Sequence, residues 1–273
     1  MPKAIAGSWG SSTVTPKNNS KPVNFEPKGK TKFDIKEASD VCALPGGRMV
    51  IVGDTSDKIG VIDANGKMTK IQLPGLKGAS QMEAVTYDPV KHHLIVSREE
   101  SRELMIYEWD PAKSKAPELK RKVELKNLDG AKNKGVEGMA YLDGHSSPTG
   151  RPQILLAKEG NPKTLELVDD KGGGKSVKVE LEEKVTKICK DFSAVTVDPK
   201  TGNLFISSDE SSTVAQLKLV REKGKIVAKL IHSFPLRDGG KPLARVEGLT
   251  FDSKGDLRVL TENDGALHTY KRQ

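Results

Sequence analysis

A pattern of two strands that occurs five times constrains this sequence more than any other feature. In each copy, a short strand of alternating apolar and polar residues passes through a polar turn into a second, mostly apolar strand. The first strands are predicted at residues 37–44, 81–88, 135–142, 191–198 and 245–252, and the second strands at 49–54, 94–99, 154–159, 204–209 and 257–262. A unit repeated in this way predicts stacked copies, because one copy alone cannot bury its apolar face.

A third strand follows each pair, and a fourth is visible in the first four copies. The copies start 44 to 56 residues apart, which is the length of a four-stranded propeller blade. The fifth copy ends at Gln273 with three strands, and residues 31–35 are predicted to supply the missing one. The sequence therefore predicts an all-β fold, a five-bladed β-propeller of four-stranded antiparallel blades that an N-terminal strand closes.

The net charge of +8 is concentrated near the N-terminus. Residues 1–36 contain seven Lys against two acidic residues, a net charge of +5, which leaves +3 for the other 237 residues. We interpret residues 1–30 as a basic flexible arm and 31–273 as the propeller. The arm lacks aromatic residues interleaved with its lysines, so nucleic acid is disfavoured as a partner except for weak contacts through the arm.

No segment of the sequence has the properties of a membrane span or of a signal peptide. No apolar run approaches the roughly 18 residues that a transmembrane helix requires. The N-terminal residues contain no apolar segment of the kind found in secretory signals. We expect a soluble protein, and the sequence leaves its compartment open.

Carboxylates occupy corresponding positions of every repeat. The last position of the second strand holds Asp54, Glu99, Glu159, Asp209 and Glu262. The opening of the first strand holds acids at two interleaved positions, Glu37 and Asp191 at the earlier one and Glu83, Glu137 and Glu247 at the later one. In a propeller the first strand starts on the face where the second strand ends, so these positions predict an acidic funnel at one mouth of the central channel. Crowded carboxylates without His or Cys suit Ca²⁺, which prefers oxygen ligands. The alternative is that each carboxylate accepts hydrogen bonds from turn N–H groups.

Three basic residues stand beside these acids: Arg98, Lys158 and Arg245. One interpretation is surface ion pairing with the neighbouring carboxylates. The other is that they bind an anionic ligand held between the metal and basic groups, as phosphoester chemistry requires. None of the five His falls in the acidic positions, which argues against a zinc enzyme and against catalysis by a pair of His side chains.

Two stretches carry a resemblance to a known family. They are DFSAVTVDPKTGNLFISSDESS, from residue 191, and VEGLTFDSKGDLRVLTEND, from residue 246. The chain resembles the SdiA-regulated (YjiK-like) family, which is similar to phytase-like propellers, from about residue 31 to the end. The resemblance implies a five-bladed propeller with a calcium site, usually in envelope or secreted proteins, and no settled activity. Residues 1–30 lie outside the resemblance. The sequence shows no export signal of the kind that such proteins usually carry, and prior removal of that signal would account for the difference.

Two functions are compatible with these patterns. The first is a calcium-binding propeller whose acidic funnel binds a small anionic or phosphorylated ligand and, in its catalytic form, hydrolyses it. The alternative is a non-catalytic module that binds a protein partner or forms part of an assembly, anchored by the basic arm. The sequence does not decide whether the protein is an enzyme, and it identifies no general base. Glu83, Glu137 and Glu247 are the best placed carboxylates.

Overall fold

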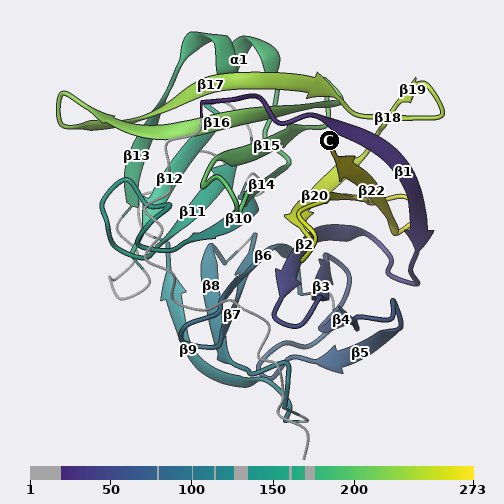
Figure 1. The fold of residues 1–273 in the computed structure, drawn as a ribbon. Coiled ribbons are helices and arrows are strands. Elements are labelled where there is room, and N and C mark those ends of the chain that lie inside the picture. Colours follow the sequence, from purple (N-terminus) through teal and green to yellow (C-terminus); the bar gives the residue numbers. More distant parts are fainter. Residues whose placement is uncertain are drawn as a thin grey trace, which may run out of the picture.

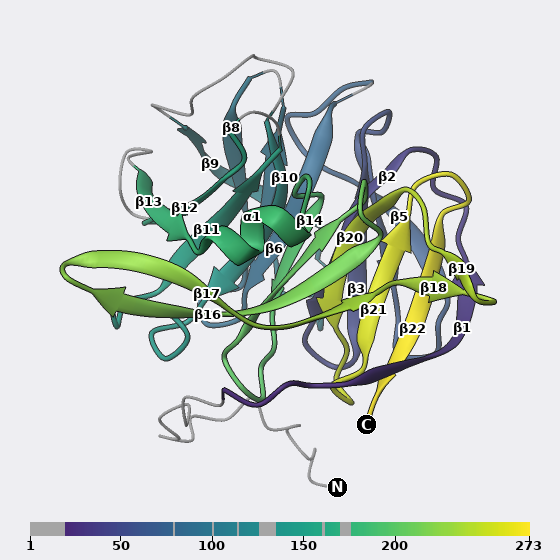
Figure 2. The same cartoon turned by 90° about the horizontal axis from the view of Figure 1, so that it is seen from above.

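The computed structural model describes residues 20–78, 80–99, 101–113, 115–125, 135–159, 162–169 and 176–273. Within these ranges the structure is all-β apart from one short helix, α1 (Glu183–Ile188). Figures 1 and 2 show the strands as sheets arranged around a common centre, which is the arrangement of a β-propeller. The mostly apolar strands of the repeats account for these sheets, because the inner strands are buried on both faces.

Four-stranded antiparallel units follow one another along the chain, and we number them first to fifth. The first unit contains β2 (Ala38–Leu44), β3 (Arg48–Gly53), β4 (Lys58–Ile62) and β5 (Met68–Gln72). The second contains β6 (Met82–Asp88), β7 (His93–Arg98), β8 (Glu103–Glu108) and β9 (Glu118–Glu124). The third contains β10 (Val136–Leu142), β11 (Gln153–Lys158), β12 (Thr164–Val168) and β13 (Ser176–Leu181).

The fourth and fifth units each carry an addition to this pattern. The fourth contains β14 (Ala194–Val197), β15 (Leu204–Ser208), β16 (Thr213–Glu222) and β17 (Lys225–Pro235). A short parallel pairing of β13 with β17 joins the third and fourth units into one eight-stranded sheet. A small hairpin, β18 (Arg237–Asp238) and β19 (Lys241–Pro242), leads to the fifth unit. That unit contains β20 (Val246–Phe251), β21 (Leu257–Thr261), β22 (Ala266–Arg272) and β1 (Phe25–Lys32).

The first strands of the units surround the centre of the molecule. Each contacts the next in the order β2, β6, β10, β14 and β20, and β20 contacts β2 in turn. Glycines allow this close approach: a Cβ added at Gly138 would lie 2.7 Å from the backbone nitrogen of Val195, and one at Gly248 would lie 2.8 Å from that of Val41. The main apolar clusters lie between successive units, so each unit is stabilised by its neighbours.

The N-terminal segment forms the outer strand of the fifth unit. β1 pairs antiparallel with β22, as Figures 1 and 2 both show. This strand covers residues 25–32, earlier than the predicted 31–35, so the predicted boundary between arm and propeller falls inside it. Residues 33–35 instead leave the strand, and Phe33 and Ile35 pack against the cluster between the first and fifth units. Residues 1–19 of the predicted arm lie outside the described residues.

Contacts of residues 21–25 with residues of the fourth and fifth units explain why β1 starts earlier than predicted. The Phe25 ring packs against the rings of Phe205, Phe234 and Phe251, with centroids 5.5 to 6.0 Å away. The fully buried amide of Gln216 accepts a hydrogen bond from the Val23 N–H at 2.9 Å and donates one to the Lys21 carbonyl at 3.2 Å. The chain before β1 is therefore attached to the fourth unit, and β1 to the fifth. No described helix is long and apolar enough to cross a bilayer.

Candidate functional site

Irregular pairing occurs where most of the first strands open. The register between first and second strand shifts at Ala38/Asp40, Met82/Val85, Val136/Gly138 and Val246/Gly248. The residues at these shifts include Ser39, Glu83, Glu137 and Glu247. A bulge takes a residue out of the strand's regular alternation and redirects its side chain. The three carboxylates predicted to face the channel therefore stand at bulges, between buried neighbours.

The Glu83 carboxyl belongs to an acidic group. Its pKa is raised to about 8, first by burial and then by the nearby carboxylates of Glu137, Asp54 and Glu99. A hydrogen bond from Ser39 lowers the pKa and offsets part of this effect. These residues come from the first three units, so the structure brings acidic residues of separate repeats within electrostatic reach, as the sequence predicts.

The Glu247 carboxyl extends the same group to the other units. Its pKa is raised to about 8, first by burial and then by the carboxylates of Asp209 and Glu262, while the Arg245 guanidinium opposes the rise. Glu83 also raises the pKa of Glu247, so the two sets of carboxylates interact with each other. We call this group the acidic funnel, and its members are Asp54, Glu83, Glu99, Glu137, Asp209, Glu247 and Glu262.

The remaining predicted acids have other surroundings. The buried Asp191 carboxylate accepts hydrogen bonds from the Ser208 hydroxyl and, at 3.3 Å, from the Glu210 N–H. Glu37 is exposed, with a left-handed backbone (φ 49°), and its carbonyl accepts the Asp54 N–H. Glu159 is half-buried at the end of β11. Hydrogen bonding at a strand end, the alternative from the sequence, therefore describes Asp191.

Asp209 both accepts a hydrogen bond at a strand end and belongs to the acidic funnel. Its Oδ1 atom accepts the Val246 N–H at 2.9 Å, which joins the fourth unit to the fifth. The same carboxylate raises the pKa of Glu247. One acidic residue can thus connect neighbouring units and contribute negative potential to the funnel.

Asp40 is a buried acid that the sequence analysis missed. Its Oδ1 accepts the Val41 N–H at 2.8 Å, and its Oδ2 accepts the Val85 N–H of the second unit at 2.9 Å. Burial raises the pKa of this carboxyl well above its usual range, and the Glu247 carboxylate contributes. The available signal was its place in the repeat, since the corresponding residues of the other units are Ala or Gly.

The three predicted basic residues have partners within the protein. Arg98 donates to the Ser80 carbonyl at 3.0 Å and lies 3.7 Å from the Glu103 carboxylate, while Arg245 lies 3.1 Å from that of Glu262. Lys158 is buried, and its ammonium is 3.4 Å from the carbonyl oxygens of Glu159 and Pro162. Ion pairing with one of the predicted acids, the simpler of the two predictions, describes Arg245, whereas Arg98 pairs with Glu103, which is not one of those acids. A role in binding an anion stays a prediction for all three.

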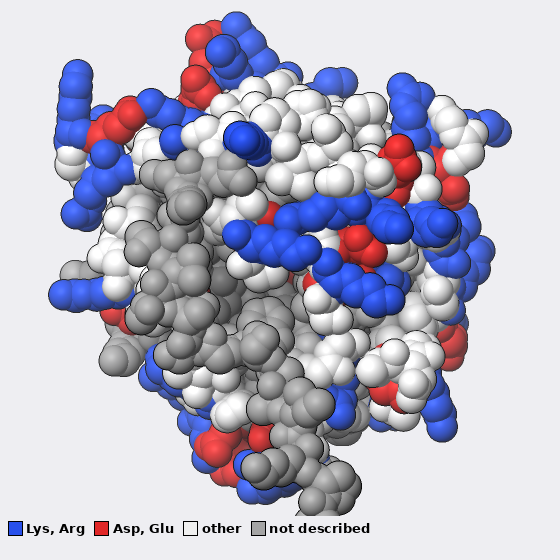
Figure 3. All heavy atoms as spheres, in the orientation of Figure 1, with Lys and Arg blue, Asp and Glu red and all other residues white. Residues whose placement is uncertain are grey.

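Many other basic side chains lie on the outer strands of the units. Lys28, Lys30 and Lys32 belong to β1, Lys120 and Lys122 to β9, and Lys225 and Lys229 to β17. Figure 3 shows Lys and Arg gathered around the outline of the molecule and on its right side in that view. Charged side chains on outer strands hinder pairing with other chains. Among the residues that shift the pKa of Glu83 or Glu247, Arg245 is the one with a positive charge.

Calcium matches the funnel in ligand chemistry but not in ligand spacing. The side chains are carboxylates, which are oxygen ligands of the kind that Ca²⁺ prefers. Among the residues that the structure describes, however, no three His, Cys, Asp or Glu side chains are grouped closely enough to hold a metal ion. The acids are distributed around the funnel instead of converging on one point.

Comparisons with known proteins agree with the propeller fold. A family model described as SdiA-regulated matches residues 44–264, and no curated protein matches. A PQQ-bound aldose sugar dehydrogenase from Streptomyces coelicolor is similar in structure, with a TM-score of 0.58, 11% identity and coverage of 92% of this chain and 99% of that one. Glutaminyl cyclase from Myxococcus xanthus gives a TM-score of 0.57 at 11% identity, covering 93% and 99%. A chain of a nidogen/laminin complex gives 0.50 at 17%, covering 80% and 69%. These similarities show the fold alone.

Proposed function

The chain belongs to the SdiA-regulated family, and we propose that it is a five-bladed propeller whose acidic funnel binds a divalent cation, Ca²⁺ in the first place. Each four-stranded unit is one blade in this proposal, and β1 closes the ring by completing the fifth. The pairing of β1 with β22 and the contacts of β20 with β2 support this reading. The observation that carries the proposed function is that carboxyls of different units stand at the bulged openings of contacting first strands, where burial and neighbouring acids raise the pKa of Glu83 and of Glu247.

Electrostatic repulsion within the funnel is the reason for a cation. Carboxylates that are buried beside one another retain their protons unless a positive charge compensates. With pKa values of about 8, Glu83 and Glu247 are mostly protonated at pH 7. Binding of a cation must therefore displace protons and reposition side chains that are not grouped beforehand. We expect weak binding, with a dissociation constant on the order of 10⁻⁴ to 10⁻³ M, that tightens as pH rises.

A thermal melt in calcium and in a chelator tests this proposal. At a Ca²⁺ concentration ten times the dissociation constant, binding adds about 1.4 kcal/mol. The melting temperature of a domain of this size should then rise by roughly 3–5 °C at pH 8.5, and by less at pH 6.5. The variant Glu247→Gln should lose this shift, whereas Glu118→Gln on the outer strand β9 should keep it. An equal shift in both variants would mean that calcium binds elsewhere.

The funnel would receive a small anionic ligand through the bound cation. Arg98 and Arg245 are engaged with Glu103 and Glu262, so they would have to leave these partners to bind the anion themselves. Hydrolysis of a phosphorylated ligand is the catalytic form of this proposal, and calcium-dependent turnover of a phosphomonoester is its test. If turnover persists in Glu83→Gln and Glu247→Gln, the funnel is not its site.

The second candidate function is a non-catalytic module that binds a protein partner. The absence of a group of three metal ligands among the described residues favours it. The similar structures also include a chain of a protein–protein complex, and propellers in general present broad rigid faces. Co-purification of a partner without any calcium effect on stability would favour this function over the first.

A further inference from the structure

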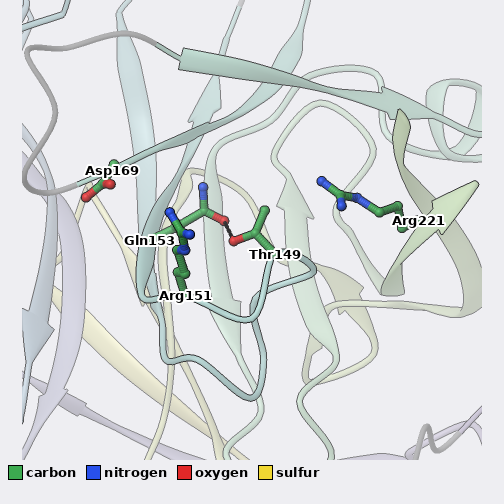
Figure 4. A pocket seen from close by; sticks show the side chains of 5 residues that line it. All are labelled: Thr149, Arg151, Gln153, Asp169 and Arg221. Carbon is green, nitrogen blue, oxygen red and sulfur yellow. Dashed lines mark hydrogen bonds between the residues drawn. The ribbon is translucent and has the colours of Figure 1, made fainter. Parts of the chain in front are cut away.

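A pocket on the face opposite the funnel has the properties of an anion site. It has a volume of about 340 Å³ and is lined by Thr149, Arg151, Gln153, Asp169 and Arg221 (Figure 4). Thr149 and Arg151 lie in the loop between β10 and β11, and Asp169 follows the end of β12. Arg221 lies near the end of β16 in the next unit. First strands end and third strands end on the face away from the funnel, so the pocket and the funnel are at opposite ends of the sheets.

The two arginines of the pocket differ from the others in the chain. Neither Arg151 nor Arg221 has an ion pair or a side-chain hydrogen bond with any residue in the described ranges, and both are exposed. Six other arginines have an ion pair or a side-chain hydrogen bond, namely Arg48, Arg98, Arg237, Arg245, Arg258 and Arg272, and Arg102 and Arg121 also interact with other residues. The two guanidinium groups without a partner therefore line the same pocket, although their residues lie in different units.

A hydrogen-bonded triangle at the base of the pocket fixes the orientation of Gln153. The Gln153 Oε1 atom accepts the Ser147 hydroxyl at 2.8 Å and the Thr149 hydroxyl at 2.7 Å, and the two hydroxyl oxygens are 2.9 Å apart. Ser147 and Gln153 are buried. Because the amide oxygen is engaged in this way, the amide nitrogen points away from Thr149, as Figure 4 shows. The pocket thus has an oriented N–H donor as well as two guanidinium groups.

We propose that this pocket binds the phosphate group of a small ligand. Two guanidinium groups supply a charge of +2 that matches a phosphate dianion, and each can form paired hydrogen bonds to its oxygens. The Gln153 amide adds a neutral donor whose orientation is set by buried neighbours. Asp169 is the one carboxylate among the lining residues, and it would exclude ligands that place negative charge on its side. The volume lies at the lower end of the range for small-molecule sites.

This inference is independent of the proposed calcium site. The pocket shares no residue with the acidic funnel, and a phosphate ligand there requires no metal. Either site could be absent without consequence for the other, and the variants that test them are different.

Titration of the full chain with inorganic phosphate, glycerol phosphate and acetate tests the inference. At constant ionic strength, we expect millimolar or tighter binding of both phosphates by calorimetry, and acetate weaker by at least about threefold. Arg151→Gln and Arg221→Gln should each weaken phosphate binding by about tenfold or more, consistent with loss of a charged hydrogen-bonding group. Because both side chains are exposed, the variants should keep the wild-type melting temperature.

Arg237→Gln is the matched control, since this exposed arginine lies in the β18–β19 hairpin away from the pocket. It should leave phosphate binding unchanged. Undiminished binding in the Arg151→Gln and Arg221→Gln variants would overturn the proposal, as would the absence of phosphate binding at about 20 mM. Equal affinity for acetate would overturn the assignment to phosphate.

Discussion

Replacing Phe25 by Ala is expected to lower the free energy of unfolding by about 3 kcal/mol, at the lower end of the range for Phe→Ala because the ring is only partly buried. The ring lies against three other Phe rings, of which Phe205 and Phe234 belong to the fourth unit and Phe251 to the fifth. The Arg272 guanidinium lies 5.8 Å from its centroid. Removing the ring takes away contacts that hold β1 where these two units meet. β1 should then separate more easily from β22 and the rest of the fifth unit.

Urea denaturation and thermal melts measure this effect. At roughly 2–4 °C per kcal/mol, the melting temperature should fall by about 6–12 °C. Val90→Ala is the control, because Val90 is 77% exposed and loses few contacts on truncation. If Phe25→Ala melts at the wild-type temperature, then β1 contributes little to the stability of the propeller and the proposed closure is incorrect.

Raising the pH from 7 to 9 in a chelator is expected to destabilise the protein, by about 1 kcal/mol for each of Glu83 and Glu247. Their pKa values are about 8 in the folded protein, against an ordinary value of 4.5. The folded state therefore holds protons that the unfolded state has already released at pH 7. Stability from this source is complete below about pH 4.5 and is lost as pH rises through 8.

The double variant Glu83→Gln/Glu247→Gln should remove most of this dependence, because an amide stays neutral at both pH values. Between pH 7 and pH 9 it should therefore keep the roughly 2 kcal/mol of stability that the wild type loses. Denaturant unfolding at pH 7 and pH 9 measures both effects, with Glu118→Gln as the control. Equal loss of stability between pH 7 and 9 in the wild type and the double variant would show that these carboxyls are not buried together.

The repeats made the fold and much of the site predictable. The second strands end within a residue of their predicted positions, since each is a short apolar run with a polar residue after it. Because equivalent positions of a repeat lie at equivalent places in the structure, acids in one sequence column meet at one end of the sheets. Seven of the ten predicted acids therefore interact in the funnel. The position of each acid within the repeat predicted that these acids lie together, whereas no acid taken alone would have indicated it.

Other features depend on contacts that a local pattern does not contain. The start of β1 is set by the Phe25 and Gln216 contacts, which join residues nearly two hundred positions apart. β14 begins at Ala194, later than predicted, because Ser193 bonds to Ser207 and Asp191 to Ser208. The bulges at the first-strand openings are not visible in the alternation of apolar residues.

The basic residues show a similar limit. The sequence places Arg98 and Arg245 beside acids of the funnel, but the side-chain conformation decides which carboxylate each one meets. The pocket at Arg151 and Arg221 requires a loop of the third unit and a strand of the fourth to lie side by side. Sequence spacing gives no direct indication of either arrangement.

The most direct test of the acidic funnel is calorimetry of calcium binding at pH 7.5 in two buffers of different ionisation enthalpy. The difference between the two heats reports how many protons are released. We predict millimolar or tighter binding with net proton release, and the loss of both binding and proton release in Glu83→Gln/Glu247→Gln. Calcium binding without proton release, or binding that the double variant retains, would contradict a site formed by these carboxyls.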